Sequence, residues 1–152
     1  MKRLVHNISV RVFEKDNDQL NSTKNLFYKL LPVDFEKEKI SVEHEKAEGF
    51  NDKTIHILSM DTSKRRNNRV LLDNIFENLS SEEKQKIKED RTTRLDSEGN
   101  FYIRLDKNSL LKNEYKLTDG GDCFHFTVKL AAYPMKKEKI LESLDMLLKD
   151  KK

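Results

Sequence analysis

The first part of the chain alternates apolar and polar positions and predicts a β-strand followed by a helix. In residues 4–13, side chains suited to a buried face recur at every second position. They are His6, Ile8, Val10 and Val12. A period of two is that of a strand with one buried face. The apolar residues of segment 20–31 instead recur at helical spacing, Asp16 or Asp18 can cap this helix, and Pro32 should end it.

The central third predicts a β-hairpin and two helices. Residues 40–44 alternate, the EGFND segment at residues 48–52 has the composition of a turn, and an apolar stretch covers residues 55–60. An apolar stripe at three-and-four spacing over residues 70–79 then predicts a helix. Residues 80–83 read S-x-x-E, a capping box that should begin a second, polar helix on the surface.

The last third predicts three strands and a terminal helix. A loop rich in turn-forming residues precedes an alternating strand at residues 101–105, and a short helical turn follows that strand. A brief strand at residues 115–117 leads into the TDGGD segment, whose paired glycines we expect at positive φ in a hairpin turn. Residues 123–130 alternate again, and apolar residues at helical spacing over residues 140–148 mark the terminal helix.

The predicted order of elements is β-α-β-β-α-α-β-β-β-α, with short strands joined by hairpin-like turns. This order predicts an α+β fold in which helices cover one face of a mainly antiparallel sheet. The chain shows no internal repeat, linker or low-complexity tract. We therefore predict a single α+β domain over residues 1–152, with only the last few residues frayed.

Composition adds a highly charged surface to this picture. Charged residues make up 38% of the chain, against roughly 25% in an average globular protein. The net charge is only +3, so the arrangement of charge matters more than its total. Residues 33–52 contain seven acids and three bases, whereas residues 63–94 contain nine bases and six acids. Two faces of opposite polarity are one interpretation, and a uniformly solvated helix surface is the other.

Cysteine usage and hydropathy indicate where the protein resides. Cys123 is the single cysteine, which excludes an internal disulfide and a cysteine-rich zinc site and favours a reducing, cytoplasmic compartment. The first residues, MKRLVHNISVRVF, are too polar for a signal peptide. Since no run approaches 18 apolar residues, we predict a soluble protein without a membrane partner.

No motif in the chain predicts catalysis. The four histidines lie on separate segments, and none has an H-x-H or H-E-x-x-H spacing that would bring two nitrogens to one metal. Cys123 and His125 share a strand face, but the local sequence lacks a third group to orient them. The glycines near residue 120 match neither a P-loop nor a dinucleotide fingerprint. We therefore predict that the protein is not an enzyme and has neither a metal site nor a cofactor.

The predicted sheet has features suited to nucleic-acid binding. Cations neutralise phosphates, and exposed aromatic rings stack on unpaired bases. If the apolar strand positions face the helices, several basic, aromatic and polar side chains share the opposite face. They are Arg11, Tyr102, Arg104, His125, Thr127 and Lys129. The alternative is a polar sheet face that is solvated and binds no ligand.

A second basic cluster lies at the start of the long central helix. Four cations gather there, and two more arginines follow downstream. They are Lys64, Arg65, Arg66 and Arg69, followed by Arg91 and Arg94. Backbone N–H groups at a helix N-terminus attract anions, so arginines beside them would strengthen a phosphate site. Arginine forms a better phosphate fork than lysine. A solvated helix start is the alternative.

Three stretches of the C-terminal half carry a resemblance to a known family. They are GNFYIRLDK at residues 99–107, YKLTDGGD at residues 115–122 and VKLAAYPMKKEK at residues 128–139. Together they resemble an archaeal RNA-binding family, sometimes described as a predicted exosome subunit, in which a sequence like NFYLRLDK precedes a hairpin and an AAYP ending. The N-terminal half agrees more loosely. Family members often carry a His-Gly-Asn-Pro type loop where residues 50–53 here read FNDK, so no binding role is carried over to this loop.

The resemblance implies a fold like that of ribosomal large-subunit protein L-five and non-catalytic RNA binding. RNA is then the expected partner, with exosome- or ribosome-associated proteins as further partners in RNA processing. The expected RNA contacts combine the two basic clusters. They are Arg11, Tyr102, Arg104, His125, Lys129, Arg65, Arg66, Arg69 and Arg94. Two alternatives stay open: a protein-interaction subunit that docks by a sheet edge or the terminal helix, and a metal-dependent hydrolase. The hydrolase would use Asp96, Asp106, Asp119 or Asp122.

Overall fold

The computed structural model describes residues 3–49, 51 and 53–151, and these residues form an α+β fold. The N-terminal part contains β1 (Val5–Glu14), the 3-10 turn η1 (Asn17–Gln19), α1 (Leu20–Leu30), α2 (Phe35–Glu38), β2 (Glu43–Glu48) and β3 (Thr54–Thr62). The C-terminal part contains α3 (Arg65–Asn78), α4 (Ser81–Glu89), β4 (Asn100–Asp106), α5 (Lys107–Leu111), β5 (Cys123–Leu130) and α6 (Lys137–Asp150).

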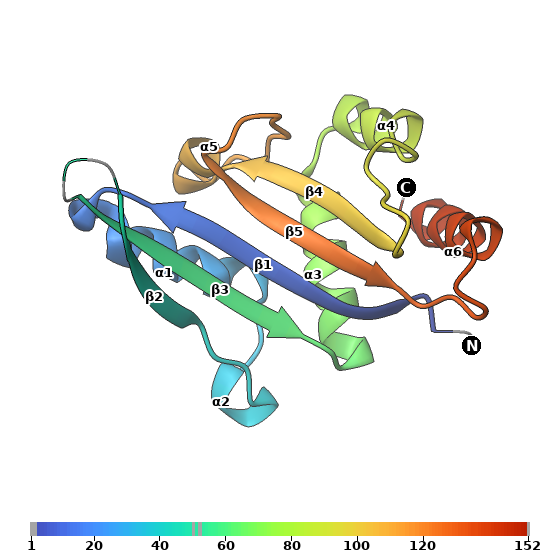
Figure 1. The fold of residues 1–152 in the computed structure, drawn as a ribbon, viewed down its shortest axis with the longest axis horizontal. Helices are drawn as coiled ribbons and strands as arrows, with labels where there is room; N and C mark the ends of the chain where they lie inside the picture. The colour runs from blue at the N-terminus through green and yellow to red at the C-terminus, as the bar shows by residue number, and fades with distance from the viewer. Residues whose placement is uncertain (1–2, 50, 52, 152) are drawn as a thin grey trace.

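The strands form one open antiparallel sheet with the order β2-β3-β1-β5-β4. Figure 1 shows α1 and α3 behind the sheet, while the face toward the viewer carries no helix. Helix α3 packs on β1, α1 on β3 and α6 on β5. The predicted arrangement, with helices over one face of an antiparallel sheet, is therefore confirmed.

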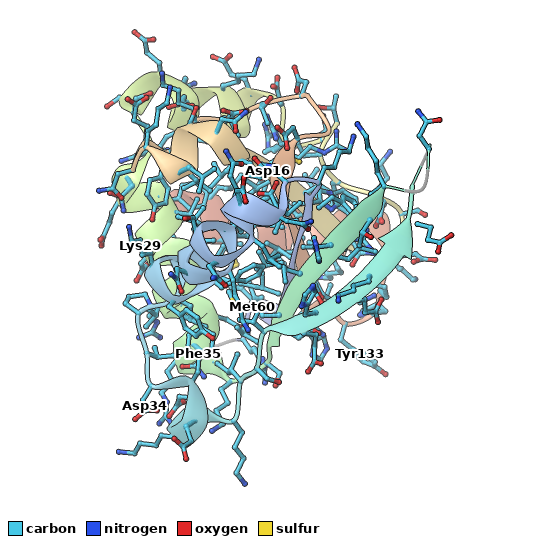
Figure 2. All side chains as sticks on the ribbon, turned by 90° about the vertical axis from the view of Figure 1, so that its left-hand side faces the viewer. Asp16, Lys29, Asp34, Phe35, Met60 and Tyr133 are labelled. Atoms are coloured by element: carbon cyan, nitrogen blue, oxygen red, sulfur yellow. The ribbon has the colours of Figure 1, made fainter. Side chains whose placement is uncertain are left out.

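The core lies between the sheet and these helices. Alternate residues of the strands are fully buried on the helix side, as the period of two predicted. On β1 and β5 they are Ile8, Val10, Val12, Phe124, Phe126, Val128 and Leu130. Figure 2 shows Met60 in the layer between β3 and α1, whereas Lys29 lies on the outer side of α1. Ring packing between Phe27 and Phe124, 5.3 Å apart, joins α1 to β5.

Local signals in the sequence act at most of the predicted boundaries. Asp16 accepts a hydrogen bond from the Asp18 amide at the start of η1, and α1 ends at Leu30, two residues before Pro32. The capping box is formed as predicted: the Ser80 hydroxyl oxygen accepts from the Glu83 amide at 3.2 Å. Helix α4 lies at the surface as expected, because Ile87 is its single buried residue.

Three local predictions need correction. Residues 115–117 form no strand; Leu117 makes only an isolated bridge to Leu105 of β4, so the sheet has five strands within the described residues. The segment at residues 115–117 therefore lies beside β4 and not beside β5. The TDGGD segment that follows it is consequently not a hairpin turn. Neither of its glycines has positive φ, which among the described glycines occurs only at Gly99, with φ +86°. The glycine held in a left-handed conformation thus lies in the loop before β4 and not in the TDGGD segment.

The strand predicted at residues 40–44 begins later than its alternation indicated. The short helix α2 intervenes, Lys39 ends it in a left-handed conformation with φ 58°, and β2 starts at Glu43. The β2–β3 hairpin is confirmed, with the Gly49 amide bonded to the Lys53 carbonyl at 2.6 Å. Phe50 and Asp52 of the predicted EGFND turn lie outside the described residues, as does Lys152 of the predicted frayed end.

A buried ionic cluster ties the end of β1 to the opposite part of the fold. The Lys107 ammonium group lies 3.1 Å from the Glu14 carboxylate and 2.9 Å from that of Asp122. Glu14 is 1% exposed and also accepts a hydrogen bond from the Thr23 hydroxyl of α1. The cluster joins β1, α1, α5 and the segment before β5, and so fixes one end of the sheet.

Among the described residues, no helix is both long and apolar enough to span a lipid bilayer.

Candidate nucleic-acid interface

The register of the sheet aligns three cationic or ionisable residues across its open face. Arg11 of β1 is paired with His125 of β5, and His125 is paired in turn with Arg104 of β4. Each has buried chain neighbours that point toward the helices, so the three side chains share the helix-free face. The Arg11 guanidinium also lies over the Phe13 ring, 5.6 Å from its centroid. A row of positive and ionisable groups therefore crosses three adjacent strands.

A second row lies beside the first. Ser9 of β1 is paired with Thr127 of β5, and Thr127 with Tyr102 of β4. Farther along β5, Lys129 is paired with Asn100, and its ammonium group donates to the Glu98 carbonyl at 3.4 Å. The structure thus places Arg11, Tyr102, Arg104, His125, Thr127 and Lys129 on one face, as the alternation predicted.

One side chain from each row contributes to an aromatic pair. The Tyr102 and His125 rings are nearly parallel, with an interplanar angle of 8° and centroids 5.4 Å apart. The Tyr102 hydroxyl donates to the Asp96 carboxylate at 2.6 Å, and this bond raises the pKa of Tyr102. The tyrosine ring is therefore held at both its face and its tip.

Asp96 organises the loop that supports this tyrosine. Its carboxylate accepts hydrogen bonds from the backbone amides of Glu98 and Asn100, at 2.9 and 2.8 Å, as well as from the Tyr102 hydroxyl. Burial would raise the pKa of Asp96, but these hydrogen bonds outweigh it and lower the pKa to about 2. Asp96 therefore stays ionised and acts as a structural acceptor at neutral pH.

The environment of His125 disfavours its protonated form. Burial lowers its pKa, and the positive charges of Arg104 and Arg11 lower it further. The imidazole is therefore mainly neutral at pH 7. An anion bound between the two arginines would remove part of this electrostatic cost, so His125 can gain a proton when a phosphate arrives.

A pocket of about 510 Å³ opens beside the aromatic pair, at the β4 edge of the sheet. Its lining combines cations, rings, hydroxyls and two carboxylates. The lining residues are Asp90, Thr93, Arg94, Tyr102, Arg104, Thr118, Asp119 and His125. The sequence groups Arg94 with the helix start, but the structure brings it here because Leu95 pairs with Phe101 and lays this segment along β4. The volume is within the usual range for a small-molecule or nucleotide site.

Arg94 has unused hydrogen-bonding capacity in this pocket. Its Nε is buried, with no hydrogen-bond partner in the part of the chain that the structure describes. One terminal nitrogen lies 3.8 Å from the Asp90 carboxylate, too far for a hydrogen bond. A buried guanidinium nitrogen without a partner is costly, and the terminal nitrogen that faces Asp90 makes no closer contact with that carboxylate, so it can donate to a ligand in the pocket.

The open face is polarised. At the β2 side, Glu43 is paired with Ser59 and Glu45 with Ile57, which places both acids on the helix-free face. Asp61 of β3 accepts a hydrogen bond from the Ser9 hydroxyl. The positive part of the face is therefore confined to β1, β5 and β4, and the acidic segment predicted from residues 33–52 forms the opposite margin.

The second basic cluster is arranged differently from the first. Arg66 donates to the Glu38 carboxylate of α2 through two nitrogens, the shortest bond being 2.7 Å. Asn67 donates to the same carboxylate at 3.1 Å, and Lys64 lies 3.8 Å from it. The bonds from Arg66 and Asn67 hold the pKa of Glu38 below its ordinary value despite the opposing effect of burial. An internal carboxylate thus occupies the anion site expected at the start of α3.

The other arginines of that cluster lie elsewhere in the fold. Arg65 and Arg69 line a shallow groove of about 270 Å³ with Arg3, Leu72 and Met146. Arg91 forms an ion pair with Asp145 of α6 at 2.7 Å. With Arg94 at the β4-edge pocket, the cluster predicted as one site is divided among four places in the fold. Helices α2 and α6 supply acids that the local sequence does not contain, and residues 94–95 run beside β4.

Three of the four acids considered for a hydrolase have structural partners, and the fourth, Asp119, lines the pocket at the β4 edge. Asp96 supports the loop before β4, Asp106 caps α5 by accepting from the Ser109 amide at 2.9 Å, and Asp122 pairs with Lys107. Among the described residues, no three His, Cys, Asp or Glu side chains gather as metal ligands. Cys123 is buried, and burial raises the pKa of its thiol, which disfavours the reactive thiolate.

Sequence reasoning missed the residues that loops bring to the pocket. Asp90 and Thr93 arrive from the end of α4 and the turn after it, and Thr118 from the segment before β5. Asp119 comes from the same segment, and the sequence had named it only as an acid for a hydrolase. No periodic pattern marks them, because they lie outside strands. The Asp-Ser-Glu-Gly-Asn composition of residues 96–100 did signal a turn, but not the bond from Asp96 to Tyr102. Tyr133, 93% exposed, is a further aromatic that the pattern did not single out (Figure 2).

Comparison with known proteins relates both the sequence and the fold to archaeal relatives. A family model described as RNA binding matches residues 7–130. RNA-binding protein PAB1135 of Pyrococcus abyssi is 29% identical over 143 residues, which cover 94% of this chain and 93% of that protein.

Solved structures show that the fold recurs over nearly the whole chain. Mth689, a DUF54 protein from Methanothermobacter thermautotrophicus, is 26% identical, has a TM-score of 0.75, and is matched over 95% of this chain and 98% of its own. AF2318 from Archaeglobus fulgidus, also described as DUF54, is 22% identical with a TM-score of 0.80 over 94% and 99%. A UPF0201 protein from Methanococcus jannaschii, 13% identical, reaches 0.59 over 95% and 91%.

Proposed function

The chain belongs to the family described as RNA binding, and from that premise we propose that it binds RNA non-catalytically on the helix-free face of its sheet. The row of Arg11, His125 and Arg104 carries this proposal. Its positive groups lie across adjacent strands, where no helix covers them (Figure 1). Phosphate contacts would supply most of the affinity, because each neutralised phosphate releases a bound counterion.

The surroundings of the row support the same interpretation. Lys129 extends the positive charge along β5, and Arg94 adds a guanidinium at the β4 edge. Glu43 and Glu45 repel a polyanion from the β2 side. We propose that the RNA lies over β1, β5 and β4 and that Arg11, Tyr102, Arg104, His125, Lys129 and Arg94 contact it. Arg65 and Arg69, which line the groove beside α3, are proposed as contacts for a longer RNA. Arg66 donates to Glu38 and is proposed with them.

Binding should be tested with fluorescently labelled RNA at low and moderate salt. Arg104→Gln with Lys129→Gln should weaken binding and reduce the slope of log affinity against log salt by about 0.7 for each phosphate of a single strand that the protein no longer neutralises. Lys29→Gln provides the matched control, since it removes one positive charge from the outer side of α1 (Figure 2). It should leave the affinity within about twofold. Salt-independent binding, or an equal effect of the control, would contradict the proposal.

The proposed role in RNA processing is supported by the family resemblance and by one structural observation, which is the difference between the two edges of the sheet. The β4 edge is covered by residues 94–95 and 116–118 of the same chain, through bonds such as Tyr102 amide to Arg94 carbonyl at 2.9 Å. The outer edge of β2 pairs with no strand among the described residues, and all six of its residues are exposed. This edge supports the second candidate, a subunit that docks to exosome- or ribosome-associated proteins by strand addition.

Co-purification from native extract separates these two candidates. A protein partner that is lost when Lys46, whose amide faces the outer edge of β2, is replaced by proline, while RNA affinity is kept, would favour the docking role. The kinship to the L-five fold and the cytoplasmic location, the latter inferred from the single cysteine, stay predictions.

A further inference from the structure

We infer that the pocket at the β4 edge receives one unpaired nucleotide, with its base against the Tyr102–His125 pair and its phosphate at Arg94 and Arg104. This inference rests on the proposed RNA binding and specifies the form of RNA that the site recognises. The pocket volume, about 510 Å³, accommodates a nucleotide and is not needed for contacts to the outside of a duplex. The pocket also adjoins the cationic row, so the strand on either side can continue over the sheet.

The aromatic pair is prepared for a base before any ligand arrives. Tyr102 and His125 are already parallel, and the bond from the Tyr102 hydroxyl to Asp96 restricts the tyrosine side chain. Both residues line the pocket. Little side-chain freedom is then lost on binding, so more of the stacking energy appears as affinity. A base can stack in this manner only when it is unpaired, because the faces of paired bases are covered within a helix.

The cations of the pocket lie where a phosphate of the same nucleotide would fit. A terminal nitrogen of Arg94 lies 3.8 Å from the Asp90 carboxylate, beyond hydrogen-bond distance, and Arg104 contacts the Asp119 carbonyl only at the limiting distance of 3.5 Å. Both can therefore donate to a phosphate without breaking a strong internal bond. An arginine whose terminal nitrogen lies beyond hydrogen-bond distance of the nearby carboxylate distinguishes this pocket from the start of α3, where Glu38 already accepts the bonds of Arg66.

The two carboxylates argue for a nucleotide over a bare phosphate. Asp90 and Asp119 line the same pocket, and their negative charges would repel a ligand that presents only phosphate oxygens. A nucleotide, however, also presents hydroxyl and amino donors on its ribose and base, and a carboxylate accepts from these. The ribose 2′-hydroxyl is one such donor and is absent from DNA. The mixture of charges therefore fits RNA that is single-stranded at this position.

The test compares three labelled probes of one mixed sequence: single-stranded RNA, the RNA duplex and single-stranded DNA. The unchanged full chain should bind the single-stranded RNA most tightly. Tyr102→Leu and, separately, His125→Leu should weaken the binding of single-stranded RNA about tenfold and the binding of duplex RNA less than about twofold. Tyr133→Leu is the matched control, because it removes an aromatic side chain, 93% exposed, that does not line the pocket; its affinity should stay within about twofold of the unchanged chain. Tyr102→Phe keeps the ring and removes only the bond to Asp96, so it should weaken binding by no more than about threefold. Circular dichroism of each variant confirms that it is folded.

A single-stranded RNA that carries 2-aminopurine gives a second readout, since stacking on an aromatic ring quenches its fluorescence. Quenching by the unchanged chain and by Tyr102→Phe, and its loss with Tyr102→Leu, is expected. If single-stranded and duplex RNA bind equally and both leucine variants weaken them equally or not at all, the nucleotide pocket is wrong while RNA binding stands. If the unchanged chain binds no RNA, the proposed function itself fails, and the pocket inference fails with it.

Discussion

At the scale of single residues, His125 is the group on the open face whose charge can change near neutral pH. It lies between Arg104 and Arg11 in the sheet register, and burial together with both arginines lowers its pKa. The free protein therefore holds a neutral imidazole that stacks on Tyr102. A phosphate placed beside it would favour the protonated ring, so RNA binding should be accompanied by proton uptake.

This linkage predicts that RNA affinity rises as the pH falls from about 8 to about 5. Because the pKa of His125 is lowered in the free protein and raised again by a bound phosphate, the affinity changes between these two pKa values and is constant above both. His125→Phe keeps a ring for stacking and should remove most of the pH dependence. Titrations of labelled RNA across this pH range measure the effect.

The folded state must be monitored over the same range, because another histidine pair also responds to acid. His44 of β2 and His56 of β3 lie 2.8 Å apart through their ring nitrogens, and burial, followed by the charge of His56, lowers the pKa of His44. Since a lowered histidine pKa contributes stability that is lost as pH falls below the unfolded value, acid should weaken the β2 attachment. If the RNA affinity of His125→Phe depended on pH in the same way as that of the unchanged chain, the assignment of this dependence to His125 would be wrong.

At the scale of elements, α4 builds two walls of the pocket although its sequence is mainly polar. The chain leaving its C-terminal end supplies Asp90, Thr93 and Arg94 to the pocket. At its N-terminal end, the Glu83 carboxylate accepts from both the Ser80 hydroxyl, at 3.1 Å, and the Leu117 amide, at 2.7 Å. The capping box therefore also holds the segment that leads to Thr118 and Asp119.

Ser80→Ala should reduce the free energy of unfolding by about 1 kcal/mol, the usual cost of losing an N-cap side chain. The Glu83 amide at the first turn of α4 then loses its acceptor. Urea denaturation measures this change. Ser81→Ala is the matched control: this exposed serine lies inside the first turn, so its removal should cost less than about 0.5 kcal/mol. Equal effects at both positions would show that the cap contributes nothing specific.

At the scale of the whole molecule, the buried cluster of Glu14, Lys107 and Asp122 closes one end of the sheet. Burial alone would raise the pKa of Glu14, but hydrogen bonds from Thr23, from the Asp16 amide and from Lys107 lower it. Burial likewise opposes the charge on Lys107, and its acidic partners raise its pKa. Glu14 and Lys107 are therefore both charged at neutral pH. The stabilising effect of the cluster through Glu14 is present above the ordinary carboxyl pKa and is lost as the pH falls below it.

Lys107→Met should destabilise the fold by about 3–5 kcal/mol at neutral pH, because it leaves the Glu14 carboxylate buried without its cation. The double variant Glu14→Gln with Lys107→Met removes that charge as well and should recover part of the loss. Thermal or urea unfolding of both variants, at neutral and acidic pH, measures the coupling between them. A double variant no more stable than Lys107→Met alone would show that the unpaired charge is not the cause.

Local patterns along the chain predicted most of the elements and most of the buried strand positions, although they missed α2 and expected His6 in place of Val5 on the buried face. The period of two along β1, β4 and β5 predicted which residues face the helices, and it thereby placed Arg11, Arg104 and His125 on the opposite face. The alternation of side chains along a strand sets which residues can face the core, and this alternation is a local property of the chain. The same is true of the capping box at Ser80 and of the end of α1 before Pro32.

Packing between distant segments, in contrast, sets which charges remain available and where the pocket lies. Glu38 reaches Arg66 from 28 positions away in the chain, and Arg94 joins the sheet because its segment runs beside β4. The brief strand expected before residue 118 became a bridge to β4 for a similar reason: the edge of the sheet, not local propensity, selects its partner. Contacts between loops carry no periodic signal, since their pairs are set by how the layers pack.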